Sequence, residues 1–283
     1  MEAKIQELAV DPAALRGLSA NLLLSHHRNN YGGAVKRLNA IRAQLAALDV
    51  ATAPGFKLNG LKREELVAAN SMRLHELYFA SLGGDGTTMT PAMSLALDAS
   101  FGSVARWRAE FAAMGKALGG GSGWVLLTFM PGDGSLVNAW CADHTHSLAG
   151  GVYVDAFMAN VDWAGVYERY QSAVDGASDA FGVGQEELSG ATLFDVRRAG
   201  MFEKADALIP GASWRDPAAV AAWSAEVPVG AEVVVYCVYG HEVGRATALR
   251  LRSQGIAARF LRGGIDGWKA AGRPLQAKAG RPD

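Results

Sequence analysis

The residue best placed for chemistry is Cys237, which follows an apolar run and precedes a helical pattern. Residues 232 to 236 favour a strand and residues 243 to 254 a helix. A short loop that closes onto a helix N-terminus directs backbone N–H groups at its first side chain, which stabilises a thiolate and any anionic group that it carries. We therefore predict a nucleophilic cysteine surrounded by the five residues that follow it, namely Val238, Tyr239, Gly240, His241 and Glu242.

Two other interpretations of Cys237 stay open. A free cysteine at a strand end is often inert core, and a loop of this kind can also bind or sense without turnover. Glu242 bears on the choice, because a carboxylate beside the loop opposes both thiolate formation and the approach of an anionic donor. His241 offsets that charge only when it is protonated. Cys141, within another apolar run, is predicted to be core.

His26 and His75 form the second candidate site. Apolar residues recur at helical spacing over residues 15 to 48 and 62 to 82, and each stripe carries one of these histidines. Gly32-Gly33 marks a bend in the first helix. Two such helices in a hairpin bring both imidazoles into one core, where neutral imidazole suits iron, manganese, copper or zinc. The alternative is that each histidine is a hydrogen-bonded core residue.

The remaining patterns divide the chain into a helical part and an alternating part. Helices are predicted over 91 to 97, 103 to 118 and 154 to 174, with a β-hairpin of strands 124 to 129 and 136 to 141. Residues 175 to 188, rich in small and acidic residues, are predicted to be a linker. Strands over 192 to 196, 232 to 236 and 258 to 261 then alternate with helices over 243 to 254 and 265 to 271. This alternation indicates an α/β domain with a parallel sheet.

Length and charge narrow the function classes. The 283 residues suggest at least two compact units, and 27 basic against 28 acidic side chains give a net charge of -1. Nothing in this balance favours nucleic acid. The N-terminus lacks a secretory pattern, and no apolar run reaches the ~20 residues of a membrane span. We therefore expect a cytoplasmic protein with no membrane partner, in which Cys141 and Cys237 form no disulfide.

The C-terminal part resembles the rhodanese family. The likeness covers about residues 189 to 276 and rests on four segments: Leu193-Phe194-Asp195-Val196-Arg197, Ile209-Pro210-Gly211-Ala212, the Cys237 loop, and Leu261-Arg262-Gly263-Gly264-Ile265. It implies a rhodanese-like domain over 189 to 283, in which Cys237 takes a persulfide from a small sulfur donor. Residues 238 to 242 are then the sulfur-binding loop, supported by Asp195 and Arg197. The chain departs from the family at Glu242, where basic residues are common, and at Leu208, where histidine is common.

Residues of about 10 to 175 resemble the iron/manganese superoxide dismutases. The likeness rests on ordered segments: His26 with Tyr31, Leu38 and Asn39; Asn70 to Leu82 with His75; Phe101-Gly102-Ser103; Gly121 to Trp124; Asp143-His144; and Asp155 to Tyr170. It implies an α+β fold, with a helical hairpin over 1 to 88 and a small α/β-hairpin domain over 89 to 174. It further implies iron or manganese on His26 and His75, with Tyr31, Trp124 and His144 beside the metal, superoxide as substrate, and a homodimer.

One segment of that family is missing here. The family supplies its last two ligands, an aspartate and a histidine, from a D-x-W-E-H-A-Y stretch, whereas Val152 here runs directly into Tyr153 and no such stretch occurs in the chain. The sheet should therefore lack a strand as well as the site lacking ligands. Ala34 stands where the family has its substrate-gating tyrosine, and Tyr31 is the nearest substitute. Residues that could complete a ligand set are Asp143, His144, His146 and Asp155.

Three hypotheses follow. The chain is a fusion in which superoxide dismutation accompanies sulfur chemistry at Cys237, with the dismutation in doubt because two ligands are missing. Alternatively, it is a non-catalytic sensing or binding protein on a degenerate dismutase scaffold. The third hypothesis is a pure sulfurtransferase with a helical appendage.

Overall fold

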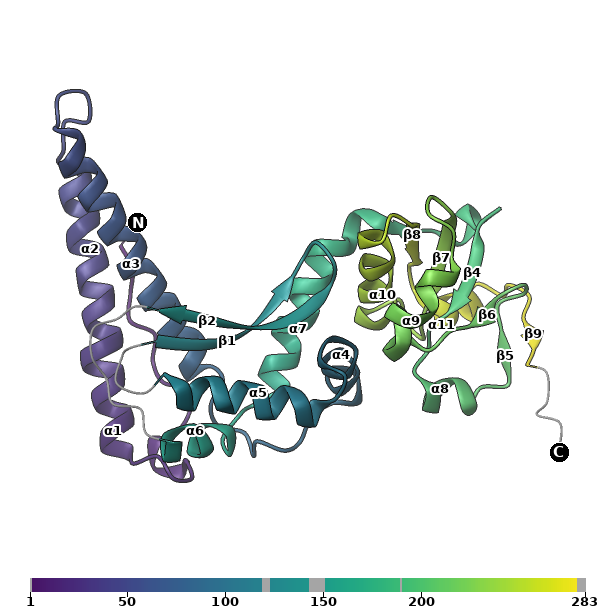
Figure 1. Cartoon of the computed structure of the whole chain (residues 1–283), viewed down its shortest axis with the longest axis horizontal. Helices are drawn as coiled ribbons and strands as arrows, with labels where there is room; N and C mark the ends of the chain where they lie inside the picture. The colour runs from purple at the N-terminus through teal and green to yellow at the C-terminus, as the bar shows by residue number, and fades with distance from the viewer. Residues whose placement is uncertain (1, 119–122, 143–150, 189, 279–283) are drawn as a thin grey trace. The chain divides into compact units, whose positions relative to one another are not determined.

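The computed structural model of the chain describes residues 2–118, 123–142, 151–188 and 190–278 (Figure 1). The chain divides into two compact units. The first consists of residues 1–88 and 150–166, and the second of residues 89–149 and 167–283. None of the helices in the described ranges combines the length and apolar composition that a membrane span needs.

The first unit is built on a helical hairpin. A 3₁₀ turn, Pro12–Ala14, precedes α1 (Ala20–Ser25), which Ser19 caps by accepting a hydrogen bond from the amide of Leu22. A π-helical turn, His26–Tyr31, joins α1 to α2 (Gly32–Ala46), and α3 (Gly55–Phe79) returns alongside α2 (Figure 1). Both predicted helices are therefore present.

The π-helical turn corrects the predicted course of the first helix. The irregularity lies at residues 26–31 and not at Gly32-Gly33, which are the first residues of α2. A wider turn shifts the helical register, so the face predicted from a 3.6-residue period is wrong before the turn. Leu22 belongs to the apolar stripe predicted over residues 15 to 48, but it is 49% exposed, whereas Leu23 is buried.

The two helices of the hairpin share an apolar seam. Leu38 and Ile41 of α2 pack with Ala68 of α3. Nearer the π-helical turn, Tyr31 and Phe79 belong to a second buried cluster, together with Leu15, Leu18, Leu23, Val35, Leu82 and Ala156. This second cluster surrounds the histidine pair described below.

Helix α6 (Gly151–Met158) and helix α7 (Trp163–Ser178) replace the single helix predicted over 154 to 174. The break between them has a local cause. The carbonyl of Asn160 accepts hydrogen bonds from the amides of Gly83 (3.0 Å) and Gly84 (3.1 Å), so it faces the loop after α3 and not a helical partner. A Cβ on Gly84 would lie 2.2 Å from the carbonyl oxygen of Val161, so this close approach requires glycine.

The second unit begins with α4 (Pro91–Phe101) and α5 (Val104–Ala117), which precede a β-hairpin. Strands β1 (Gly123–Met130) and β2 (Ser135–Ala142) pair antiparallel, as the sequence predicts, around a turn in which Gly134 has a φ of 69°. Among the described residues this sheet has two strands. The missing segment predicts such a short sheet.

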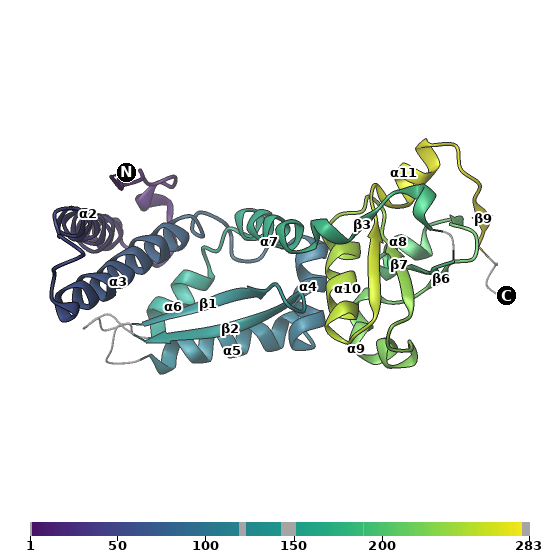
Figure 2. The ribbon, with the colours of Figure 1, turned by 90° about the horizontal axis from the view of Figure 1, so that it is seen from above.

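The rest of the second unit is a five-stranded parallel sheet in the order β3-β8-β7-β4-β6. Figure 2 labels β3, β7 and β6 of this sheet. Its strands are β3 (Gly182–Val183), β4 (Thr192–Asp195), β6 (Ser213–Trp214), β7 (Glu232–Tyr236) and β8 (Ala257–Leu261). A separate pair, β5 (Ala207–Leu208) and β9 (Gln276–Ala277), is antiparallel. The predicted parallel α/β architecture is confirmed.

Helices cover both faces of this parallel sheet. Helices α9 (Val220–Trp223) and α10 (Glu242–Ser253) pack on the face that carries Val233 and Val235, and α11 (Gly264–Ala270) packs on the face that carries Val234 and Tyr236. Helix α8 (Ala199–Glu203) follows β4. Each valine of β7 is fully buried, as expected for the central strand of a sheet covered on both sides.

The segment predicted to link the domains is folded into the second unit. Helix α7 continues to Ser178, a 3₁₀ turn covers Asp179–Phe181, and β3 pairs with β8. The small and acidic composition that suggested free chain has a structural use, since Asp179 accepts a hydrogen bond from Arg262 at 3.0 Å.

Candidate functional site

Cys237 lies at the carboxyl end of the central strand β7, directly before the loop that leads into α10. Its side chain is 5% exposed. The predicted order of strand, short loop and helix N-terminus is therefore present, and the thiol lies at the edge of the sheet where ligands of open α/β sheets bind. Because the thiol is buried at this strand end, the nucleophile and the inert core cysteine both stay predictions.

The amides at the start of α11 fix the Cys237 loop. Ile265 N–H donates to the Cys237 carbonyl at 3.1 Å, and Asp266 N–H donates to the Val238 carbonyl at 3.0 Å. Gly264, with a φ of 57°, allows this approach, because a Cβ there would lie 2.5 Å from both of those carbonyl oxygens. The Gly263-Gly264 pair noted in the sequence thus lets the start of α11 hydrogen-bond to the Cys237 loop.

Opposing effects act on the Cys237 thiol. Burial raises its pKa, and the backbone N–H groups of Gly244, Gly240 and His241 act in the other direction by stabilising the thiolate. The negative charge of Glu242 adds to the effect of burial, and the net result is a pKa above the ordinary value. The loop is thus shaped for an anion, but the resting group is a thiol. Its Sγ lies 3.9 Å from the carbonyl oxygen of His241, which can accept the thiol proton as a weak hydrogen bond.

Glu242, the first residue of α10, is buried and hydrogen-bonded. Tyr167 donates its hydroxyl to Oε1 at 2.9 Å, and Gln171 donates its side-chain amide to Oε2 at 3.1 Å. The Glu242 side chain is 6% exposed. Tyr167 and Gln171 belong to α7, and sequence reasoning missed both. Neither residue stands out by type or spacing, because their partner is about 70 positions further along the chain.

The other residues predicted around Cys237 differ in exposure. Tyr239 and His241 are exposed at the tip of the loop, with ring centroids 5.8 Å apart. Gly240 is buried, with a φ of 74°, and a Cβ there would lie 2.7 Å from the carbonyl oxygen of Leu261. The tip is therefore the solvent-exposed part of the loop.

Asp195 and Arg197 form a buried ion pair at the end of β4. The guanidinium Nε lies 2.9 Å from both carboxylate oxygens, and Nη2 also donates to the Ala207 carbonyl at 2.9 Å. The two side chains are 0% and 4% exposed. This pair fastens β4 to the segment that follows α8, and its predicted support of the Cys237 loop stays a prediction.

The two predicted metal-ligand histidines face each other in the first unit. His26 begins the π-helical turn and His75 lies on α3, with their Nε2 atoms 3.1 Å apart. Two nitrogens bound to one metal at about 2.1 Å each lie about 3 Å apart when the angle at the metal is near a right angle. The pair therefore has the spacing of two ligands that share an ion.

A proton lies between the two facing Nε2 atoms of this pair. His75 Nδ1 donates to the Ser71 carbonyl at 2.7 Å, because a carbonyl only accepts, and the Nε2 of neutral His75 then carries a lone pair. His26 Nε2 must therefore donate across the 3.1 Å contact. Burial and the neighbouring His75 lower the pKa of His26 to about 4, so the His26 ring is neutral at pH 7.

An aromatic cage surrounds the histidine pair. Tyr78 and Phe79 lie with ring centroids 5.3 and 5.6 Å from that of His26. Tyr153 donates its hydroxyl to that of Tyr78 at 2.6 Å, and burial raises the pKa of both phenols. Burial in this cage favours the neutral forms of these side chains.

The predicted neighbours of the metal are placed as follows. Tyr31 is buried, and its hydroxyl accepts from the amide of Gln6 at 2.9 Å and donates to Glu76 at 3.2 Å. Trp124 lies on β1, paired with Cys141, and that cysteine is partly and not fully buried. His144, with Asp143 and His146, lies outside the described residues. Asp155 lies on α6 and is exposed.

The described residues do not fit a complete redox metal site. Within them, no group of three or more His, Cys, Asp or Glu side chains is arranged to hold an ion. His26 and His75 supply two nitrogen donors and no carboxylate. A metal that cycles between two oxidation states needs a ligand set that holds it firmly and tunes its potential, and two imidazoles do this poorly.

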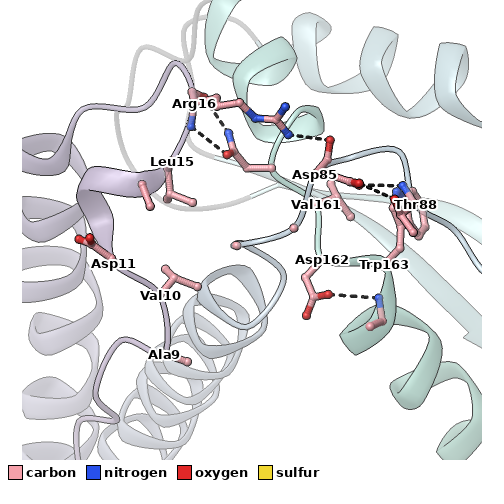
Figure 3. Close-up of a pocket in the computed structure, with 15 residues that line it drawn as sticks. Ala9, Val10, Asp11, Leu15, Arg16, Asp85, Thr88, Val161, Asp162 and Trp163 are labelled. Atoms are coloured by element: carbon pink, nitrogen blue, oxygen red, sulfur yellow. Dashed lines mark hydrogen bonds between the residues drawn. The ribbon is translucent and has the colours of Figure 1, made fainter.

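A surface pocket in the first unit has a structural explanation (Figure 3). It is lined by residues 9–16, the loop after α3 and the start of α7. Its carboxylates are engaged locally, since Asp85 accepts from the amides of Thr87 and Thr88, and Asp162 accepts from the amide of Ala164. Arg16 donates to the Asp85 carbonyl at 2.7 Å. The pocket is thus a junction of three chain segments.

Comparisons with known proteins agree with both parts of this description. Residues 89–152 match the profile of the C-terminal domain of iron/manganese superoxide dismutases, and residues 183–271 match that of the rhodanese-like domain. A protein named superoxide dismutase [Fe] from Cupriavidus metallidurans is 56% identical over 193 residues, which cover 60% of this chain and 98% of that protein. Two further relatives are each 28% identical to this chain, which covers 89% of their length. They are a superoxide dismutase [Fe] from Aquifex pyrophilus and superoxide dismutase [Mn] 1 from Halobacterium salinarum.

The chain therefore belongs to the iron/manganese superoxide dismutase family, and its C-terminal part is a rhodanese-like domain. The alignment also bears on the missing segment. Because 60% of 283 residues is about 170, about 23 of the 193 aligned positions hold no residue of this chain. This deficit is what the absence of a Trp-Glu-His stretch from the sequence predicts.

Proposed function

We propose that this protein carries sulfur as a persulfide on Cys237. The observation that carries the proposal is the arrangement around Sγ, where the N–H groups of Gly240, His241 and Gly244 converge at the N-terminus of α10. Such a nest of amides stabilises a terminal sulfur anion as well as it does a thiolate. The exposed loop tip gives a donor access to an otherwise buried thiol.

The proposed transfer has two steps. The thiol loses its proton to solvent, and the thiolate attacks the outer sulfur of a donor R–S⁻, forming a Cys–S–S⁻ persulfide while the bond between R and that sulfur breaks and the electron pair leaves with R. An acceptor nucleophile then attacks the outer sulfur, and the Cys237 thiolate is released. No external oxidant or reductant is needed.

For the dismutase-like region we propose a scaffold role. The family metal, iron or manganese, would bind at His26 and His75, and there it would supply one-electron redox chemistry toward superoxide. Because those two donors are all that the described residues offer, we propose that superoxide removal is lost in this chain. His26 and His75 bind one another through the proton shared between their Nε2 atoms.

The test of the sulfur proposal is mass spectrometry of the full chain after incubation with thiosulfate or an organic persulfide. One added sulfur, about 32 Da, should appear on the wild type and on Cys141→Ser, and be absent from Cys237→Ser. Cys141→Ser is the matched control, because it removes the other free thiol. If no donor adds sulfur to the wild type, the domain is a binding or sensing module and the proposal fails.

A further inference from the structure

Two side chains of α7 reach the first residue of the helix that follows the sulfur-binding loop. Tyr167 and Gln171 are four positions apart, so they lie on one face of α7, and each donates to a different oxygen of Glu242. Both oxygens of the carboxylate are thereby fixed. Glu242 cannot turn toward solvent without losing both hydrogen bonds.

A second connection joins α7 to the loop itself. Arg245 donates from Nε to the Gly240 carbonyl at 3.1 Å, and that same Nε lies 3.2 Å from the carboxylate of Asp175 on α7. The Arg245 side chain is 15% exposed. Helix α7 therefore holds both the loop and the start of α10.

The position of Glu242 determines how its charge acts on an incoming anion. Glu242 occupies the first turn of a 12-residue helix, whose N–H groups otherwise create a site for anions beside Cys237. A buried negative charge there offsets part of the attraction for an incoming anion. The repulsion grows with the charge of the donor, so a dianion is disfavoured more than a monoanion.

We propose that Glu242, held by Tyr167 and Gln171, is a specificity-determining residue that selects singly charged sulfur donors over dianionic ones. This inference rests on the proposed persulfide at Cys237 and names its substrate class. It also gives α7, a helix of the dismutase-like region, a positioning role in the sulfur site.

Two donors that differ by one charge provide the measurement. Thiosulfate is a dianion and methanethiosulfonate a monoanion, and each passes its outer sulfur to a thiolate, leaving sulfite or methanesulfinate. The quantity measured is the ratio of kcat/KM for thiosulfate to that for methanethiosulfonate, with cyanide as acceptor. Glu242→Gln should raise this ratio about 3- to 10-fold, as expected for removal of one charge at close range in a partly screened site.

The Gln substitution preserves the local hydrogen bonds. The side-chain oxygen of the new Gln still accepts from Tyr167, and the side chain of Gln171 can turn so that its oxygen accepts from the new NH₂ group. Glu232→Gln is the matched control, since Glu232 begins β7 at the opposite end of the strand from Cys237 and is exposed. It should leave the ratio unchanged. An unchanged ratio in Glu242→Gln, with sulfur still added to Cys237, would overturn the specificity inference and leave the proposed function standing.

A double variant tests the positioning role of α7. In Tyr167→Phe/Gln171→Ala the carboxylate loses both donors and can rotate toward water, where screening weakens its repulsion. The ratio should rise, by less than in Glu242→Gln. A ratio equal to that of the wild type would contradict the positioning role of α7. Absence of sulfur on Cys237 in the wild type would instead defeat the proposed function itself.

Discussion

The hydroxyl of Tyr167 lies 2.9 Å from Oε1 of Glu242, which joins the last helix of the dismutase-like region to the helix that begins beside Cys237. The two residues are 75 positions apart. Because Glu242 is buried, the hydrogen bond is made to a charged group out of contact with water, and such bonds contribute more than neutral surface ones. The relationship couples the stability of α7 to the geometry of the Cys237 loop.

Loss of this bond should destabilise the second unit. Tyr167→Phe removes the donor and keeps the ring, so we expect a loss of about 1 to 3 kcal/mol in the free energy of unfolding. Urea denaturation followed by circular dichroism measures it. The control is Tyr239→Phe, since the Tyr239 ring is 55% exposed at the loop tip, and it should change stability by less than about 0.5 kcal/mol. Equal stability of the two variants would contradict the assigned bond.

The raised pKa of Cys237 predicts the pH dependence of persulfide formation. Only the thiolate attacks, and a pKa above the ordinary value of about 8.5 means that the thiolate fraction is still increasing at pH 9. The single-turnover rate should therefore rise with pH through that range. In Glu242→Gln the curve should move to lower pH, because one of the charges that raise the pKa is removed. A wild-type rate that levels off below pH 8 would show that the amide groups dominate over burial.

Gly264 should be intolerant of any side chain. Alanine there must adopt a φ of 57°, and its Cβ would meet the carbonyl oxygens of Cys237 and Val238 at 2.5 Å. We expect Gly264→Ala to cost about 2 to 5 kcal/mol and to abolish sulfur addition, because the loop must move. Gly272→Ala is the matched control. The φ of Gly272 is 66° and the space around a new Cβ is open. We therefore expect a loss of about 1 to 2 kcal/mol in the free energy of unfolding and normal sulfur addition.

The incomplete ligand set predicts weak metal binding. Elemental analysis of purified protein should find iron and manganese well below one equivalent, with no superoxide removal above that of free metal in the assay. His27→Gln is the control for His26→Ala. The ring of His27 lies 2.8 Å from the Gln6 carbonyl, whereas the ring of His26 faces His75. One equivalent of metal that disappears in His26→Ala and persists in His27→Gln would show that the scaffold proposal is wrong.

The sequence by itself determined the local elements and singled out Cys237 as the proposed nucleophile. Apolar runs and helical spacing depend on which face of each element is buried, so they predict the β-hairpin, the parallel sheet and the strand-loop-helix order around the cysteine. The apolar stripes at helical spacing placed His26 and His75 on facing helices. The absence of a Trp-Glu-His stretch also indicated that the dismutase-like sheet would be short.

Tertiary structure alone decided the features that depend on contacts between distant residues. The sequence period gave no sign of the π-helical turn at 26–31, the helix break at Asn160, or the folding of residues 175–188 into the second unit, because each is fixed by hydrogen bonds to other segments. The same holds for Glu242. Its charge was evident in the sequence, but its burial under Tyr167 and Gln171 depends on how α7 packs against α10, which no local pattern encodes.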